Sequence, residues 1–198
     1  MLVNPSSFYR YNVADTCSVW NVLSSLMLYS RARQAGVLFI CTHFVIYECL
    51  HKPRKKIDNC DLELQRRLKR AQQDSAFVSY SIDIADLQTI ELLENRKRLG
   101  KGELSAIAFA LKTGQAFITD DQKARKLAQQ ILQQSLTQTT PHLVGWLFYT
   151  NCLSDGDKDI LIREHKEMGC TLGVYFEEMY HEAYRCKFLM CQGVNNDG

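Results

Sequence analysis

The sequence predicts an α/β fold with three layers, in which helices cover both faces of a central parallel sheet. Short apolar runs alternate with stretches whose apolar residues recur at helical spacing, which is the pattern of repeated β-α-β units. The 198 residues are 46% hydrophobic and include only ten glycines and three prolines. A chain of this composition can bury a sizeable core and is neither collagen-like nor disordered.

The first predicted elements form two strand–helix units. Residues 11–15 are predicted as a strand that ends in an acid, and 16–30 as a helix with one apolar stripe. A second strand over 37–40 follows Gly36, and Thr42 is placed to cap a helix that runs to about His51. Pro53 then prevents this helix from continuing.

The next elements continue the alternation. The pattern predicts a charged helix over 61–73, a strand over 76–82, a helix over 84–98, a helix over 102–112, a strand over 115–119 and a helix over 121–132. In the helix over 102–112, Gly114 is expected as the C-terminal cap. The residues expected to face inward there are Leu104, Ile107, Ala108 and Leu111.

The C-terminal third is predicted to be helical over 141–151, 154–168 and 174–190, with Ser154 and Asp157 resembling a capping box. Its aromatic residues at helical spacing are typical of core, with an interface or a base-stacking surface as the alternative. We expect an α/β domain over 1–135, a helical extension over 136–191 packed on the same domain, and a flexible tail over 192–198.

The basic residues of the chain are concentrated in two clusters. The net charge is +2, but residues 51–70 carry eight Lys or Arg against three Asp or Glu. A second basic cluster comprises Arg96, Lys97, Arg98 and Lys101. Such runs are typical of solvated helix faces, and a rim that contacts phosphates is the alternative.

The eight cysteines are expected to be reduced and mostly buried, because the sequence shows neither an export signal nor a run of about 18 apolar residues. We therefore expect a cytoplasmic protein that does not span a membrane. No Cys-x-x-Cys pair is present, which disfavours a zinc ribbon. A metal shared by His181, Cys186 and Cys191 is a weaker alternative.

Carboxylates follow the predicted strands at the edge where parallel sheets place their sites. They are Asp15, Glu48, Glu103, Asp120 and Asp121. Taken singly, each has a structural interpretation as a helix cap, a first-turn acid or a salt-bridge partner. Together, acids that converge on one edge repel one another unless a cation neutralises them. Mg²⁺ suits such oxygen ligands, and the chemistry that follows is phosphodiester hydrolysis.

Four segments in order resemble the motifs of PIN-domain nucleases, most closely the small prokaryotic proteins related to VapC toxins. They are Val13-Ala14-Asp15-Thr16, Tyr47-Glu48, Gly100-Lys101-Gly102-Glu103-Leu104-Ser105-Ala106 and Phe117-Ile118-Thr119-Asp120-Asp121-Gln122-Lys123-Ala124-Arg125. The resemblance covers about residues 10–135. It implies a PIN-like α/β/α fold and an endonuclease that depends on Mg²⁺ or Mn²⁺, usually acts on RNA and belongs to a toxin–antitoxin pair.

The resemblance also implies roles for individual residues. Asp15, Glu103, Asp120 and Asp121 would be metal ligands, and Glu48 would complete the catalytic acids. Thr16 and Thr119 would support ligands or water by hydrogen bonds, while Lys123 and Arg125 would meet substrate phosphate or, alternatively, be ordinary surface charges. Cys17 departs from the family pattern, in which Ser or Asn is common at this position, so a supporting hydrogen bond is expected to be weaker.

Partners follow from the same resemblance. We expect RNA or single-stranded nucleic acid, with an antitoxin or other regulatory protein and a homodimer as further candidates for the helical extension. Two alternatives stay open: a nuclease that acts on single-stranded DNA or invading nucleic acid, and a binding module that has the fold without catalysis. The sequence has no Gly-x-Ser-x-Gly, Walker or Gly-x-Gly-x-x-Gly motif that would favour other chemistry.

Overall fold

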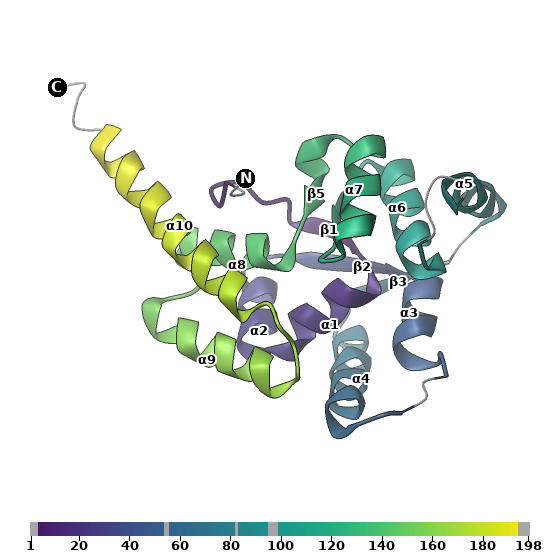
Figure 1. Ribbon diagram of the computed structural model, residues 1–198, viewed down its shortest axis with the longest axis horizontal. Helices are drawn as coiled ribbons and strands as arrows, with labels where there is room; N and C mark the ends of the chain where they lie inside the picture. Colours follow the sequence, from purple (N-terminus) through teal and green to yellow (C-terminus); the bar gives the residue numbers. More distant parts are fainter. Residues whose placement is uncertain (1–3, 54–55, 82, 95–98, 194–198) are drawn as a thin grey trace.

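The computed structural model describes residues 4–53, 56–81, 83–94 and 99–193, with residues 84, 87, 93, 94 and 191–193 described by their backbone alone (Figure 1). Five strands form one all-parallel sheet in the order β3-β2-β1-β4-β5. The strands are β1 (Tyr11–Ala14), β2 (Leu38–Thr42), β3 (Phe77–Tyr80), β4 (Ala116–Ile118) and β5 (Thr137–Gln138). The predicted α/β class and parallel sheet are confirmed.

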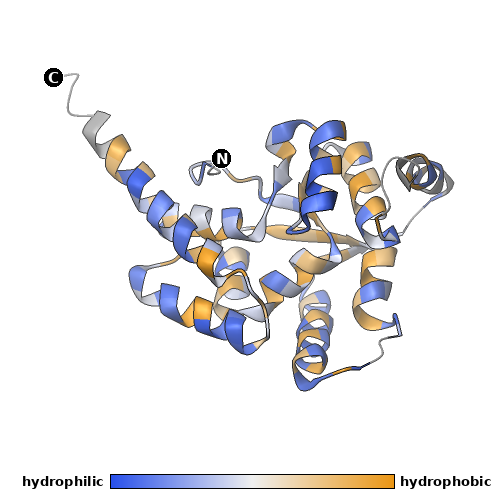
Figure 2. Cartoon of the chain, viewed as in Figure 1, coloured by the Kyte–Doolittle hydropathy of each residue, from blue (hydrophilic) through white to orange (hydrophobic). Residues whose placement is uncertain are grey.

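The core lies on both faces of this sheet. In the register, Val13 of β1 pairs with Ile40 of β2 and with Phe117 of β4. Phe39 and Phe77, on neighbouring strands, stack with ring centroids 4.9 Å apart and are fully buried. Apolar strands of this kind are expected when helices cover both faces of a sheet, and Figure 2 shows the apolar strands at the centre of the molecule.

Helices cover the sheet from both sides. In Figure 1, α1 (Thr16–Ser24), α2 (Leu26–Gln34) and α4 (Asn59–Gln73) lie below the strands, and α6 (Lys101–Thr113) and α7 (Gln122–Ile131) lie above them. At the right of that view are α3 (His43–Leu50) and α5 (Ile84–Glu94), and the short 3-10 helix η1 (Gln134–Leu136) precedes β5.

The C-terminal third forms α8 (Thr140–Tyr149), α9 (Asp155–Glu167) and α10 (Gly173–Gly193), as predicted. The Asp157 carboxylate accepts hydrogen bonds from the backbone N–H and the hydroxyl of Ser154, so the predicted capping interaction is present. The described part of the tail, residues 192 and 193, belongs to α10, and residues 194–198 lie outside the described residues.

The order of the strands creates a switch point between β1 and β4. The chain leaves β1 toward β2 and β3 with its helices on one face, and then returns to β4 and β5 with its helices on the other. Parallel sheets bind ligands outside the carboxyl ends of the strands at such a point. The residues that follow β1 and β4 are Asp15 and Thr119–Asp121, so the topology places two of the four predicted segments there.

Two predicted elements differ from the structure. The helix expected over 16–30 is divided at Ser25, whose extended backbone ends α1 and whose hydroxyl caps α2. The Ser25 hydroxyl donates to Oε2 of Glu164 at 2.6 Å, and the Ser24 hydroxyl lies 2.5 Å from Nδ1 of His165. Glu164 and His165 belong to α9. Polar side chains from a distant helix thus fix a break that local apolar spacing did not indicate.

Strand β5 was not predicted, because two polar residues carry no strand pattern. It forms because Gln138 pairs with Ile118 of β4 and its side chain bonds Asn12 and the backbone of Tyr9. Leu111 was predicted to face inward but is 45% exposed, whereas Leu104, Ile107 and Ala108 are buried as expected.

Some of the sequence predictions lie outside the described residues. These include the basic cluster at Arg96, Lys97 and Arg98, and the side chain of Cys191. Among the residues that are described, no helix combines the length and apolar character that crossing a bilayer requires. The seven cysteines whose side chains are described form no disulfide with one another.

Candidate metal and nuclease site

Asp15 lies at the switch point, completely buried at the N-terminus of α1. Its Oδ1 accepts from the backbone N–H of Ser18 at 2.9 Å, and its Oδ2 accepts from the hydroxyl of Thr119 at 2.5 Å. The thiol of Cys17 also donates to Oδ1, at 3.1 Å. Burial raises the pKa of Asp15 to about 6, and the nearby carboxylate of Asp120 adds to the increase. Keeping the Asp15 carboxylate ionised in this buried position therefore costs free energy.

Cys17 thus supports Asp15 by a hydrogen bond, although a thiol is a weaker donor than the hydroxyl or amide expected here. Burial, followed by the charges of Asp15 and Asp120, raises the pKa of this thiol far above its usual range. The side chain therefore stays protonated and acts as a donor.

Asp120 and Asp121 follow β4 and have different surroundings. Asp120 is held by the backbone N–H of Thr140 at 2.9 Å, by the Thr140 hydroxyl at 2.5 Å and by the side-chain amide of Asn21 at 2.8 Å. Burial raises its pKa in spite of these bonds. Asp121 caps α7, because its Oδ1 accepts from the backbone N–H groups of Lys123 and Ala124.

Asn21 and Thr140 belong to the site although the sequence did not point to them. Thr140 directly precedes Pro141 at a helix start, a pattern that predicts the helix but not the contact with Asp120. Asn21 is a half-buried residue of α1, and no sequence signal identifies it. Thr140 lies 20 positions from Asp120 in the chain, and Asn21 lies 99 positions from it.

Glu48 connects two further segments. Its Oε2 accepts from the hydroxyl of Thr16 at 2.8 Å, and its Oε1 accepts from the backbone N–H of Gly102 at 3.3 Å. Lys52, one turn later on α3, lies 3.6 Å from Oε1. The salt bridge considered from the sequence is therefore present, yet Glu48 is also bound to the segments that carry Asp15 and Glu103.

The glycines before Glu103 allow this close approach. A Cβ at Gly102 would lie 2.3 Å from Oε2 of Glu48, and one at Gly100 would lie 2.4 Å from Oε2 of Glu103. Any other residue at these positions would displace the carboxylates. The Gly-x-Gly-Glu segment thus makes room for two acids at the start of α6.

Glu103 has the least satisfied carboxylate of the set. Its Oε2 is buried and has no hydrogen-bond partner within the described residues. Burial raises the pKa of Glu103, and the charges of Glu48 and Asp121 contribute to the increase. A buried oxygen that carries charge and lacks a donor is a candidate position for a cation.

The structure therefore brings all four predicted segments together. Thr16, Glu48 and Gly102 form one hydrogen-bonded chain, and Asp15 with Thr119 forms the second. The interaction of Asp15 with Asp120, and those of Glu103 with Glu48 and Asp121, are repulsive. Within the described part of the chain, however, no three His, Cys, Asp or Glu side chains are arranged as metal ligands.

The donor set fits a hard divalent cation in its chemistry. Carboxylate oxygens are what Mg²⁺ and Mn²⁺ bind, and the unpartnered Oε2 of Glu103 and the mutual repulsion of the acids are relieved by positive charge. Asp15, Glu103, Asp120 and Asp121 are the residues that would hold such an ion. Since no ligating arrangement exists among the described side chains, binding would require rotation of at least one carboxylate.

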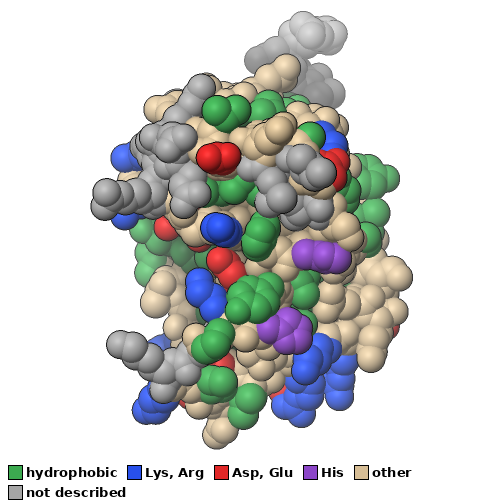
Figure 3. All heavy atoms as spheres, turned by 90° about the vertical axis from the view of Figure 1, so that its right-hand side faces the viewer, with side chains coloured by type: hydrophobic (Ala, Val, Ile, Leu, Met, Phe, Trp, Pro, Cys, Tyr) green, Lys and Arg blue, Asp and Glu red, His purple; other side chains and the backbone are tan. Residues whose placement is uncertain are grey.

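A cavity of about 660 Å³ opens beside Glu48. Phe44 and Tyr47 of α3 and Lys52 line it, together with Lys101 at the start of α6. Figure 3 shows the face that carries α3, α5 and α6, where apolar, basic and acidic side chains and histidines are mixed. The cavity therefore offers flat rings and positive charge next to the acids.

The two basic residues predicted to meet phosphate lie on α7. Lys123 is exposed, whereas Arg125 is partly buried, and its charge partly opposes the burial that raises the pKa of Asp120. Arg125 therefore interacts electrostatically with the acidic edge. Lys123 contributes its backbone N–H to the Asp121 cap, and its side chain projects to the surface.

Comparison with known proteins supports part of the resemblance. The search of the curated proteins and that of the solved structures found no match. The model of the family described as DUF3368, a PIN domain, matches residues 39–136, from within β2 to the end of η1. This span includes Glu48, Glu103, Asp120 and Asp121, while Asp15 precedes it and is joined to it through Thr119. Residues 39–136 of this chain therefore match the PIN domain family.

Proposed function

We propose that this protein is a divalent-metal-dependent endonuclease that hydrolyses phosphodiester bonds, with RNA as its substrate. The observation that carries the proposal is the meeting of four separate segments at one switch point, through the bonds Thr16–Glu48–Gly102 and Asp15–Thr119. The match of residues 39–136 to the PIN domain family supports the same reaction class.

The chain's own residues prepare this site in two ways. The hydroxyl of Thr119 and the N–H of Ser18 hold Asp15 as a buried carboxylate, and Thr16 and Gly102 orient Glu48. Asn21 and Thr140 hold Asp120 in the same manner. A divalent ion bound by such acids polarises a phosphodiester and makes water a better nucleophile near neutral pH.

The cavity beside Glu48 supports a nucleic-acid substrate. Tyr47 and Phe44 provide faces on which a base can stack, and Lys52 and Lys101 provide charge for phosphate. RNA is preferred to DNA on the family resemblance alone. A protein partner that blocks the acidic edge, as an antitoxin would, and a homodimer remain predictions.

The test is a cleavage assay with single-stranded RNA and single-stranded DNA of one sequence, in Mg²⁺, in Mn²⁺ and in EDTA. We expect metal-dependent cleavage of RNA, and a loss of at least about 100-fold in Asp15→Asn, because removing a ligand costs more than removing a group that only orients one. Asp83→Asn, an equal change of charge at an acid outside the site, is the matched control.

Each result of this assay decides between the alternatives. Cleavage of DNA alone would replace the proposed substrate. Cleavage in EDTA, or full activity of Asp15→Asn in Mn²⁺, would contradict the metal mechanism. An absence of cleavage together with no Mn²⁺ binding at millimolar concentration would favour a binding module that has the fold without catalysis.

A further inference from the structure

A second groove lies on the other side of α7 from the core, between this helix, the N-terminal segment and α8. Its volume is about 1080 Å³. Among the described residues that line it are three basic side chains, Arg10, Arg125 and Lys126, and none is Asp or Glu. Within the described part of the chain, none of these three side chains forms an ion pair with an acid.

One face of α7 is directed into this groove. Gln122, Arg125, Lys126 and Gln129 line it, and their spacing of three and four residues places them on a single side of a helix. They extend over about 10 Å of helix, at 1.5 Å per residue. Figure 2 shows α7 as one of the most hydrophilic helices of the molecule. The α7 side of the groove therefore presents an extended row of hydrogen-bond donors rather than a single binding point.

The opposite wall carries aromatic rings. Trp146 of α8 stacks on Phe8 with ring centroids 5.5 Å apart, and the guanidinium of Arg10 lies 5.8 Å from the Trp146 ring. Tyr9 also lines the groove and is 48% exposed. Hydrogen bonds between Tyr9 and Gln138 of β5 hold this N-terminal segment against the sheet.

The groove leads toward the acidic site. Arg125 lines it and also interacts electrostatically with Asp120. Gln122 directly follows Asp121, and Thr139, another lining residue, directly precedes Thr140, which holds Asp120. A ligand in the groove would therefore have one end beside Asp120 and Asp121.

We infer that this groove binds the sugar–phosphate backbone of single-stranded nucleic acid and guides the strand to the acidic site. The inference rests on the proposed function and adds the path of the substrate to it. A lining with three cations and no described acid suits a chain of phosphates, and the exposed ring of Tyr9 and the glutamine amides suit unpaired bases. The walls on both sides favour a single strand over a duplex.

The experiment measures binding without catalysis. A fluorescein-labelled single-stranded RNA is titrated in EDTA, and its anisotropy is followed over a range of salt concentrations. With three phosphate contacts, the slope of log K against log salt is about −2, and each lost contact reduces its magnitude by about 0.7. We expect Arg10→Gln and Lys126→Gln to show this reduction and to bind about fivefold more weakly at low salt.

Lys166→Gln is the matched control, because Lys166 is an exposed cation on α9, away from the groove. Equal affinities and slopes for the wild type and the two groove variants would overturn the inference, as would an absence of RNA binding by the wild type. Competition by duplex RNA or by polyglutamate as strong as that by unlabelled single strand would also overturn it, since another occupant would then fit equally well.

Failure of the proposed function would look different. Asp15→Asn should bind the labelled RNA as the wild type does. If neither the wild type nor any variant cleaves RNA or DNA, while the groove variants still show the reduced salt slope, the catalytic proposal is wrong and the inference about the groove is supported. If cleavage depends on Asp15 but RNA binding is unchanged in the Arg10 and Lys126 variants, the catalytic proposal is supported and the groove is not the binding site.

Discussion

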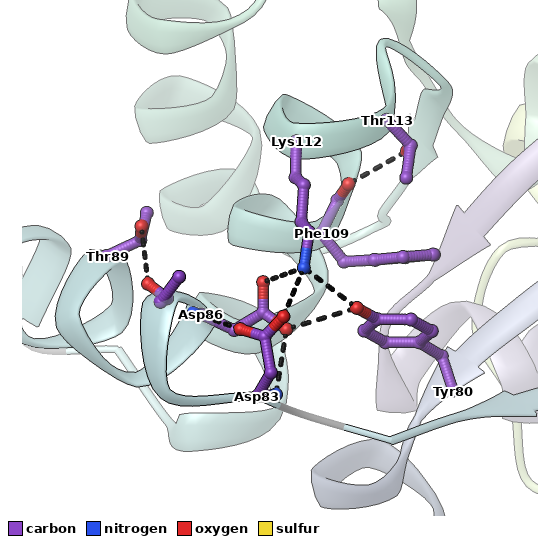
Figure 4. A network of polar contacts seen from close by, with 8 residues as sticks. Tyr80, Asp83, Asp86, Thr89, Phe109, Lys112 and Thr113 are labelled. Carbon is purple, nitrogen blue, oxygen red and sulfur yellow. Dashed lines mark hydrogen bonds and ion pairs between the residues drawn. The ribbon is translucent and has the colours of Figure 1, made fainter.

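Two groups of carboxylates in this protein have opposite surroundings. Asp83 and Asp86, at the start of α5, point toward Lys112 of α6, whose ammonium lies 2.6 Å from Asp83 and 3.2 Å from Asp86 (Figure 4). The same ammonium donates to the hydroxyl of Tyr80 at 2.9 Å. Hydrogen bonds from Lys112 lower the pKa of Asp83, and those acids and Tyr80 raise the pKa of Lys112. The protein supplies the cation for this group.

Within the described part of the chain, no ion pair holds Asp15, Glu103 or Asp120 at the switch point. Burial raises the pKa of all three acids, and like charges add to the increase at Asp15 and Glu103. The charge of Lys52 opposes the increase at Glu103 and that of Arg125 opposes it at Asp120, but both pKa values stay raised. The first group is a complete electrostatic unit that joins α5 to α6. The negative charge of the second group is not neutralised in this way, which is expected where a site binds a cation from solution.

The largest expected difference between the groups concerns stability without metal. Asp15→Asn keeps a good helix cap and removes a buried charge. Because the pKa of Asp15 is raised from 3.8 to about 6, the ionised acid destabilises the folded state by about 3 kcal/mol at pH 7.5. We expect the variant to be more stable than the wild type by up to this amount in urea unfolding with EDTA. Lower stability of the variant would show that Asp15 is a structural acid.

The opposite sign is expected for the other group. Asp86 is 2% exposed and accepts from Lys112, Tyr80 and the backbone N–H of Asp83. Asp86→Ala should lower the free energy of unfolding by about 2 kcal/mol, because charged hydrogen bonds are lost. The same substitution at Asp159, which is exposed on α9, is the control and should have little effect. Equal effects at both positions would mean that the Lys112 network contributes nothing.

The pH dependence separates the buried charge from other causes. Asp15 has a folded pKa of about 6, above its unfolded value of 3.8, so the folded state binds the proton more tightly. Acidification through the range from pH 6 to pH 4 therefore stabilises the wild type relative to Asp15→Asn. The difference between the two proteins should shrink by about 2 kcal/mol between pH 7.5 and 4.5. A difference independent of pH would show that packing, not charge, causes it.

Another buried group titrates in the same range but cancels in this comparison. Burial lowers the pKa of His165 to about 4. Both proteins therefore lose stability as the pH falls from about 6.5 to 4, because their unfolded chains bind the proton first. Only the difference between them reports on Asp15.

The comparison also shows which parts of the molecule could be predicted. Strands and helices with strong apolar patterns were predicted within a few residues, since their burial depends on local spacing. The break at Ser25 and strand β5 were not, because they depend on Glu164 and His165 and on Asn12, which lie more than 100 residues away.

The candidate site follows the same rule. The four acidic segments were predictable, because parallel topology brings the ends of β1 and β4 to one edge of the sheet. Their supporting contacts were not: Asn21 and Thr140 on Asp120 depend on the exact positions of α1 and α8. Whether the predicted residues act as metal ligands stays a prediction.

A smaller effect is expected where backbone and acid are in close contact. In Gly102→Ala, a Cβ would lie 2.3 Å from Oε2 of Glu48 and 3.2 Å from the hydroxyl of Thr16. The carboxylate must move, which should cost about 1 to 2 kcal/mol of stability and also lower cleavage. Gly156→Ala, in α9, is the matched control, because a Cβ there would lie 4.0 Å from the hydroxyl oxygen of Ser154, which is an ordinary contact distance. An unchanged Gly102→Ala protein would show that Glu48 needs no fixed position.

The smallest effect tests whether the second group binds a cation. Mn²⁺ at ten times its dissociation constant should stabilise the wild type by about 1.4 kcal/mol, because only the folded chain holds the ligands together. Glu103→Gln should lose most of this gain, since it removes the charge of the carboxylate that has an unpartnered oxygen among the described residues. Asp83→Asn should keep the gain, because Lys112 already occupies that group. If Asp83→Asn loses the stabilisation and Glu103→Gln retains it, the two groups of carboxylates have been assigned the wrong way round.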